Sequence, residues 1–282
     1  MNLHDGLKSG LHLYEPGSDE PLVLAFDTAT AAFAAALLQG DRILGGVQSL
    51  AERNHSVNII PQLQQLLRET GAGGEALTGL AVGIGPGSYT GVRIAVTAAK
   101  TLAWVWDKPL VGVSSLELLA LGGGPLGHAE GAEPGDEAWV VPLMDARRGQ
   151  VYTALFDAAP SGWSRLAEDQ IRLMSDWRGE LIRRLEAAGD HTGEGLPARL
   201  RFTGDPALHL EEIGLLEQEL ADRYPDLRLE VRPHVAEGRW AALLGSVRLL
   251  AGEQDTAHDL VPNYTQLAEA EAKLQARLRE GS

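Results

Sequence analysis

The fold of this chain is decided by residues 80–106, LAVGIGPGSYTGVRIAVTAAKTLAWVW. They predict a short buried strand, Leu80 to Ile84, then a glycine-rich turn and a long helix. Apolar residues recur every three or four positions after the turn, so they share one face of that helix. The turn carries three glycines and two hydroxyl side chains: Gly85, Gly87, Gly91, Ser88 and Thr90. The glycines permit a tight backbone path, and Ser88 or Thr90 can cap the helix.

Two interpretations of this turn stay open on the sequence alone. A helix that begins after such a turn can point its free N–H groups at a phosphate. The turn matches neither standard phosphate motif, because it lacks a Gly-Lys-Ser/Thr ending and has Ser88 where a dinucleotide loop has its third glycine. The alternative is that the glycines let the strand and the helix pack closely.

Composition indicates a soluble globular protein with two domains or lobes. The chain has 282 residues, 44% hydrophobic and 22% charged. Cysteine is absent, which excludes disulfides and thiolate metal sites and fits a reducing cytoplasm. A net charge of −15 disfavours direct binding of nucleic acid, so we expect any connection to RNA to run through a partner. No apolar run is long enough to cross a membrane, and we expect a cytoplasmic protein without membrane contact.

Before the decisive stretch, the sequence predicts a three-strand meander and a helix. The first strand, Leu22 to Phe26, ends at Asp27 and Thr28, which can face a phosphate or its magnesium or can cap the bend. Capping is the simpler interpretation. His55 begins the helix without a second histidine four residues away, which favours capping or packing over metal binding. With the strands and helices that follow, this order predicts an α/β fold.

Several motifs together resemble the TsaB (YeaZ) family. They are, in order, Phe26-Asp27-Thr28, Arg53-Asn54-His55-Ser56, Gly83 to Ile94, Val113-Ser114-Ser115-Leu116-Glu117 and Asp145-Ala146-Arg147. The resemblance is dense from about residue 22 to 156 and thins afterwards to Gly204-Asp205 and Val261-Pro262-Asn263-Tyr264.

The resemblance implies a fold of the actin/sugar-kinase/Hsp70-ATPase class, with two RNase H-like lobes built on mixed sheets. We accordingly expect five segments: a flexible extension (1–20), an N-terminal lobe (21–121), a flexible insertion (122–137), a C-terminal lobe (138–267) and a charged C-terminal helix or tail (268–282).

The resemblance also implies a function. Proteins of the TsaB family work in bacteria with TsaD and the ATPase TsaE to place a threonylcarbamoyl group on the adenosine beside the tRNA anticodon. TsaD is the catalytic relative, and TsaB is a smaller, inactive one that supports it. We therefore expect a heterodimer with TsaD, a ternary complex with TsaE, a homodimer when the chain is alone, and only indirect contact with tRNA.

TsaD-like proteins carry a His-His-x-x-x-His cluster, two histidines of which hold the catalytic metal. Aligned by eye, Ser115 and Leu119 stand at those two positions. Serine is a poor ligand and leucine is none. We expect neither a metal site nor catalytic residues in this chain.

In the family, the helices before and after the glycine-rich turn pack against the partner subunit. Here they span 55–70 and 91–106, and each carries more apolar surface than one sheet face needs. The expected interface residues are His55, Val57, Ile60, Leu63, Leu67, Arg93, Val96, Lys100 and Trp104. The alternative is that this apolar surface packs inside the lobe.

The remaining expectations concern nucleotides. The residues of the vestigial phosphate loops are expected to be Asp27, Thr28, Gly85, Gly87, Ser88, Thr90 and Gly91. We expect no tightly bound cofactor, with weak ATP or ADP binding at a subunit boundary. The competing hypothesis is a nucleotide-dependent kinase or ATPase of the actin-like class. It needs a second phosphate loop in the C-terminal half, for which Gly204-Asp205 is the candidate.

Overall fold

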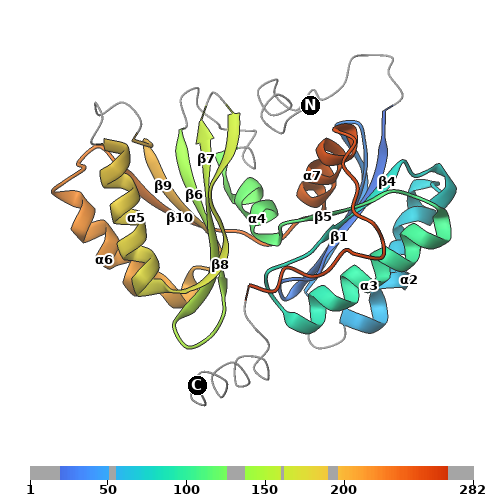
Figure 1. The fold of residues 1–282 in the computed structure, drawn as a ribbon, viewed down its shortest axis with the longest axis horizontal. Helices are drawn as coiled ribbons and strands as arrows, with labels where there is room; N and C mark the ends of the chain where they lie inside the picture. The colour runs from blue at the N-terminus through green and yellow to red at the C-terminus, as the bar shows by residue number, and fades with distance from the viewer. Residues whose placement is uncertain (1–19, 51–54, 126–136, 160–161, 190–195, 266–282) are drawn as a thin grey trace, which may run out of the picture.

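The computed structural model describes residues 20–50, 55–125, 137–159, 162–189 and 196–265, with the backbone alone for residues 50 and 55–58. The described residues form two five-stranded sheets with helices on both faces of each (Figure 1). The first sheet consists of β1 (Leu22–Asp27), β2 (Ala32–Gln39), β3 (Arg42–Leu50), β4 (Gly79–Gly83) and β5 (Leu110–Val113). The second consists of β6 (Ala138–Asp145), β7 (Gln150–Ala159), β8 (Gly162–Leu173), β9 (Arg199–Gly204) and β10 (Arg228–Pro233).

The two sheets share one topology. Their strand orders are β3-β2-β1-β4-β5 and β8-β7-β6-β9-β10, so each places its third, second, first, fourth and fifth strands side by side. In both, the first three strands form an antiparallel meander and the last two add in parallel. The expected fold, α/β with two RNase H-like lobes and mixed sheets, is confirmed.

Within the described residues, four helices cover the outer faces of the sheets (Figure 1). On the first sheet they are α2 (His55–Thr70) and α3 (Tyr89–Trp106); on the second they are α5 (Met174–Gly189) and α6 (Leu210–Ala221). Two 3₁₀ turns, Gly74–Ala76 and Ala207–His209, lie in the connections. The predicted strand, turn and helix of residues 80–106 are realised as β4, the turn and α3.

The other two helices of the described part of the chain, α4 (Ser115–Gly123) and α7 (Gly238–Leu250), lie between the sheets and are exchanged between the lobes (Figure 1). Helix α4 follows β5 of the first sheet but packs on β6, β7 and β9 of the second. Helix α7 follows β10 of the second sheet but packs on β1, β2, β4 and β5 of the first, and the two helices touch. The expected boundaries, 21–121 and 138–267, keep each helix with the strands that precede it in the chain, whereas each helix packs mainly on the other sheet.

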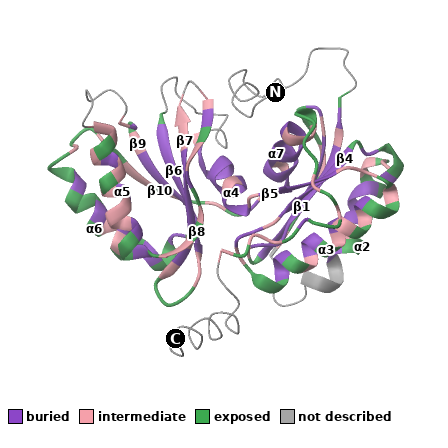
Figure 2. Ribbon diagram, in the orientation of Figure 1, coloured by how far each residue is buried: buried purple, intermediate pink, exposed green. Residues whose placement is uncertain are grey.

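Burial explains why both helices lie in the middle. Both are buried almost all round, as Figure 2 shows, and a helix that is apolar on every side belongs between two layers. Glycines allow the close approach: a Cβ at Gly238 would lie 2.1 Å from the backbone of Ala35, and one at Gly245 would lie 2.3 Å from the Cβ of Ala81. One hydrophobic core therefore runs from the first sheet through α7 and α4 to the inner face of the second.

The extension 1–20 and the tail 268–282 lie outside the described residues, apart from residue 20. Of the expected insertion 122–137, Gly122 and Gly123 are the buried end of α4, and residues 126–136 lie outside the described part. In the described residues, the helices are too short or too polar to span a bilayer.

Candidate functional site

The first part of the candidate site is the bend after β1. Asp27 and Thr28 are fully buried there. The Asp27 carboxylate accepts the N–H of Ala29 at Oδ1 (2.8 Å) and the hydroxyl of Ser115 at Oδ2. Burial raises the pKa of this carboxyl above its ordinary value, and the two hydrogen bonds oppose part of that rise. The Thr28 hydroxyl donates to the carbonyl of Gly91 (2.7 Å).

The glycine-rich turn closes directly onto this bend. The Ser88 N–H donates to the carbonyl of Ala29 (2.7 Å). A Cβ at Gly87 would lie 2.4 Å from that same carbonyl oxygen, and one at Gly91 would lie 2.3 Å from the carbonyl oxygen of Thr28. Glycines are therefore required where the two segments meet. Close packing of the turn on the bend is enough to explain why glycines stand at these positions of the motif.

All seven residues expected in the vestigial loops come together here, at the carboxyl ends of β1 and β4. Their exposure divides them. Asp27, Thr28, Gly85 and Gly91 are buried and Gly87 is half-buried, whereas Ser88 and Thr90 are exposed. Ser88 caps α3, as predicted, by accepting the N–H of Gly91 (3.3 Å).

The start of α4 completes the closure. The Ser115 hydroxyl, which donates to Asp27, accepts the N–H of Gly85 (3.0 Å), and the Ser115 N–H donates to the Gly85 carbonyl (3.0 Å). Leu119, one turn later, is buried in the core with 1% exposure. The two positions at which the resemblance places metal-binding histidines in TsaD thus hold a hydroxyl bonded on both sides and a core side chain.

The second lobe has a comparable arrangement at its equivalent edge. Asp145, which ends β6 as Asp27 ends β1, accepts the N–H of Arg147 (3.0 Å), and its Oδ1 lies 3.7 Å from Nε2 of the buried His209. Gly204 has φ +84° and leads into Asp205, whose N–H donates to the Leu143 carbonyl (2.8 Å). The candidate second phosphate loop is therefore a tight turn packed against β6.

Three of the expected interface residues lie inside the first lobe, which corrects the prediction. Leu63, Leu67 and Val96 are 1%, 7% and 3% exposed and belong to the core. They lie on the faces of α2 and α3 that cover the first sheet, so that sheet accounts for their apolar stripe.

Other expected interface residues are on the surface. Trp104 is 80% exposed and Ile60 is 37% exposed, and Arg93 is exposed. Lys100 is half-buried, because its Nζ donates to two backbone carbonyls of the segment after α7. His55 and Val57 lie in the first turn of α2, where side chains are outside the description.

Sequence reasoning missed two features of this region. Val105, 62% exposed, adds to the apolar surface beside Trp104. Tyr89, 54% exposed, carries Arg93 over its ring at 5.1 Å and lies 5.7 Å, between ring centres, from Tyr264. Tyr89 and Arg93 are four residues apart, a spacing that brings side chains together on a helix, and this was the available signal for the first contact. The second joins residues 175 positions apart and had none.

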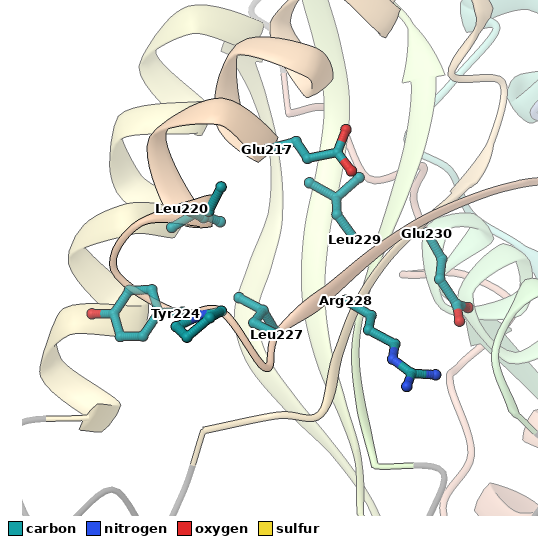
Figure 3. A pocket seen from close by; sticks show the side chains of 9 residues that line it. Glu217, Leu220, Tyr224, Leu227, Arg228, Leu229 and Glu230 are labelled. Atoms are coloured by element: carbon teal, nitrogen blue, oxygen red, sulfur yellow. The ribbon is translucent and has the colours of Figure 1, made fainter.

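A hollow of about 500 Å³ lies elsewhere, between the end of α6 and β10 (Figure 3). Leu220, Tyr224, Leu227 and Leu229 line it with Arg228 and two glutamates. None of the predicted site residues contributes to it. Within the described ranges, no three His, Asp or Glu side chains form a group that could hold a metal ion.

Comparisons with known proteins identify the family. The family model for TsaD, tRNA N6-adenosine threonylcarbamoyltransferase, matches residues 40–200. The tRNA threonylcarbamoyladenosine biosynthesis protein TsaB of Bacillus subtilis is 35% identical over 253 residues, 89% of this chain and 96% of that protein. TsaB of Escherichia coli is 36% identical over 140 residues, 50% of this chain and 57% of that protein.

Solved structures agree on the fold. YeaZ from Pseudomonas aeruginosa superposes with a TM-score of 0.61 at 21% identity, covering 86% of this chain and 99% of that one. The motifs, the duplicated topology and the sequence match over 89% of the chain lead to one conclusion: the chain belongs to the TsaB family, whose named members take part in the biosynthesis of tRNA threonylcarbamoyladenosine.

Proposed function

We propose that this chain is a non-catalytic subunit that binds a TsaD-type transferase and supports threonylcarbamoyl transfer to the adenosine beside the tRNA anticodon. The observation that carries the proposal is the closure of Asp27 by Ser115 and Ala29 at the site where the fold would otherwise present a carboxylate to a ligand.

A catalytic carboxylate must reach its substrate or its metal. Both oxygens of Asp27 are engaged with the protein, and the side chain is wholly buried. The raised pKa of Asp27 also disfavours the charged form that would attract magnesium. Ser115 and Leu119 offer no metal ligand in place of the transferase's histidines. These features favour a non-catalytic, supporting role for this chain over a catalytic one.

The outer surface of α2 and α3 supports partner binding. The two helices pack against each other on the first sheet, and Trp104 projects from α3 with 80% of its surface exposed. Exposed tryptophans flanked by apolar and basic side chains are typical anchors of protein interfaces. Val105 is exposed next to Trp104 in the chain, and the same two helices also expose Ile60 on α2 and Arg93 near the start of α3. We assign this surface to TsaD, to a complex that includes TsaE, and to a two-fold homodimer when the chain is alone.

The remaining parts of the proposal follow. The net charge of −15 argues that tRNA is reached through the partner. Since the phosphate loops are closed on one another, no nucleotide binds tightly to the isolated chain, and weak ATP or ADP binding is confined to the subunit boundary.

Reconstitution tests this function. The purified chain is incubated with tRNA and a threonylcarbamoyl donor, alone and with TsaD and TsaE, and modified adenosine is measured by mass spectrometry. We expect no product from the chain alone, product from the full set, and a large loss when this chain is omitted. Modification by the chain alone would overturn the non-catalytic assignment. Equal product without the chain would overturn the supporting role.

A further inference from the structure

The segment that follows α7 returns along the whole length of α3, and we call residues 255–265 the strap. Its contacts with the first lobe, in chain order, are Asp255 N–H to the Leu110 carbonyl (2.8 Å), the carbonyls of His258 and Leu260 to Lys100 Nζ (3.0 and 3.1 Å), and Tyr264 against Tyr89. Because Leu110 follows the end of α3 and Tyr89 begins it, the strap runs antiparallel to the helix. It is thereby fixed to the first lobe at both ends and in the middle.

One residue of the strap also reaches the second lobe. The Asn263 N–H donates to the carbonyl of Ile84, which directly follows β4 (2.7 Å). Its side-chain Nδ2 donates to Oδ2 of Asp169 (3.1 Å), a residue of β8 in the second sheet. Asn263 therefore joins the two lobes through one backbone bond and one side-chain bond.

The acceptor on the second lobe is held firmly. Asp169, whose side chain is 8% exposed, pairs through Oδ1 with Arg165, and Arg165 pairs in turn with Glu117 of α4 (2.8 Å). Arg165 also lies 4.6 Å above the ring of Phe156. These contacts fix the orientation of the Asp169 carboxylate, which accepts the hydrogen bond from Asn263.

The same carboxylate oxygen contacts the hinge. The Ser114 hydroxyl donates to Oδ2 of Asp169 (2.7 Å), and Ser114 is the single residue between β5 of the first sheet and α4, which packs on the second. Rotation of one lobe against the other has to change the backbone torsions at such a connection. Asn263 and Ser114 therefore converge on one oxygen at the point where rotation would occur.

We propose that Asn263 locks this hinge. It ties the strap, and with it the first lobe, to Asp169 of the second lobe, so that the lobes keep one relative orientation. Many two-lobed proteins close by hinge motion around a ligand. Here the C-terminal strap restricts that freedom in addition to the bonds of Ser115 to Asp27 and Gly85, and the chain presents its surfaces in a fixed arrangement. The inference concerns the isolated chain and does not depend on the partner assigned above.

The experiment measures the distance between the lobes. Because the chain has no cysteine, Thr97→Cys on α3 and Gln218→Cys on α6, both exposed, give two specific sites for spin labels. Double electron–electron resonance then reports the distribution of distances between the lobes. We expect one narrow peak for this labelled parent chain.

Three variants of the labelled chain test the lock. Asn263→Asp replaces the donor with a second negative charge facing Asp169, and we expect a broadened or displaced distribution. Asn263→Ala removes the amide without adding charge, and we expect broadening. Val261→Asp, at a position 62% exposed, adds the same charge to the strap and should keep the parent distribution.

Circular dichroism checks that each variant is folded. Asn263→Ala decides the question if Asn263→Asp yields too little folded protein. A parent-like narrow peak in the Asn263 variants would overturn the proposal, as would an equal change in Val261→Asp.

Discussion

The hydroxyl of Ser115 donates a hydrogen bond to the buried carboxylate of Asp27, although 88 positions separate the two residues. Ser115 begins α4 and Asp27 ends β1, and the same Ser115 oxygen accepts the N–H of Gly85 in the glycine-rich turn. Three segments are joined through one hydroxyl group. The edge of the first sheet at the carboxyl ends of β1 and β4 is thereby filled by the protein's own side chains.

The raised pKa of Asp27 gives a pH-dependent prediction. Since folding raises this pKa, the unfolded chain releases its proton first as pH increases through the ordinary range of aspartate. The contribution of Asp27 to the free energy of unfolding should therefore fall with rising pH, by at most about 1.4 kcal/mol per pH unit. Asp27→Asn should lack this fall. Urea unfolding of both proteins between about pH 4 and pH 7 measures it. If the difference in unfolding free energy between the parent and Asp27→Asn does not change with pH, the raised pKa of Asp27 is contradicted.

The contact between Gly91 and Thr28 predicts a steric effect. In Gly91→Ala the new Cβ would lie 2.3 Å from the Thr28 carbonyl oxygen, so the turn or the bend must move. We expect a loss of about 1–3 kcal/mol in the free energy of unfolding. Gly214→Ala is the matched control, because Gly214 lies within α6 and its added Cβ would meet nothing within 4 Å beyond the backbone of its own helix turn. That change should stabilise the protein by about 0.5–1 kcal/mol. Equal effects at both positions would show that the closed loops are not tightly packed.

The buried and exposed sides of α2 should respond differently to truncation. Leu63→Ala removes a side chain that is 1% exposed, and we expect a loss of about 2–5 kcal/mol in unfolding free energy. Ile60→Ala, at 37% exposure, should cost well under half as much. Chemical denaturation compares the two. A large effect of Ile60→Ala and a small one of Leu63→Ala would mean that α2 is rotated relative to the described packing.

The proposed partner surface makes Trp104 its anchor. Trp104→Ala should leave the melting temperature nearly unchanged, because the side chain is 80% exposed. It should weaken binding to a TsaD-type partner by about 30-fold or more, the effect expected of an interface hot spot worth about 2 kcal/mol. Titration calorimetry measures the affinity. Leu208→Ala, 73% exposed on the second lobe, should bind like the parent. If Leu208→Ala weakens binding and Trp104→Ala does not, the partner uses the other lobe.

Nucleotide affinity separates the supporting role from the kinase or ATPase hypothesis. Titration of the isolated chain with Mg-ATP should give no binding in the micromolar range, since the segments that would grip phosphates are bonded to one another. The rate at which phosphate is released from ATP should be the same with the chain present as in buffer alone. Micromolar affinity accompanied by turnover would favour the enzyme hypothesis.

Much of the fold could be predicted from the sequence because the signals are local. The spacing of apolar residues after Gly91 predicts α3, and Ser88 was a candidate cap from its position alone. The closeness of Asp27 to Gly85 follows from both being at carboxyl ends of neighbouring parallel strands. Such relations depend on the order of elements, which the sequence displays.

The errors arose where an apolar surface had to be assigned to a neighbour. Val96 and Leu63 looked like interface residues, because periodicity reports that a face is apolar but not what covers it. The same ambiguity hid the exchange of α4 and α7: both are recognisably apolar helices, and nothing in their residues names the sheet on which they pack. The bond from Asn263 to Asp169 joins distant polar residues and had no sequence signal.

The exchange of the two central helices has a consequence for biosynthesis. Strands β1, β2 and β4 are made early, yet α7, the helix that shields their inner face, follows the strands of the second sheet in the chain. During synthesis the first sheet therefore keeps an uncovered apolar inner face until α7 has emerged from the ribosome. Neither half released by a cut between α4 and β6 would be a self-sufficient folding unit, so the protein matures as a single entity.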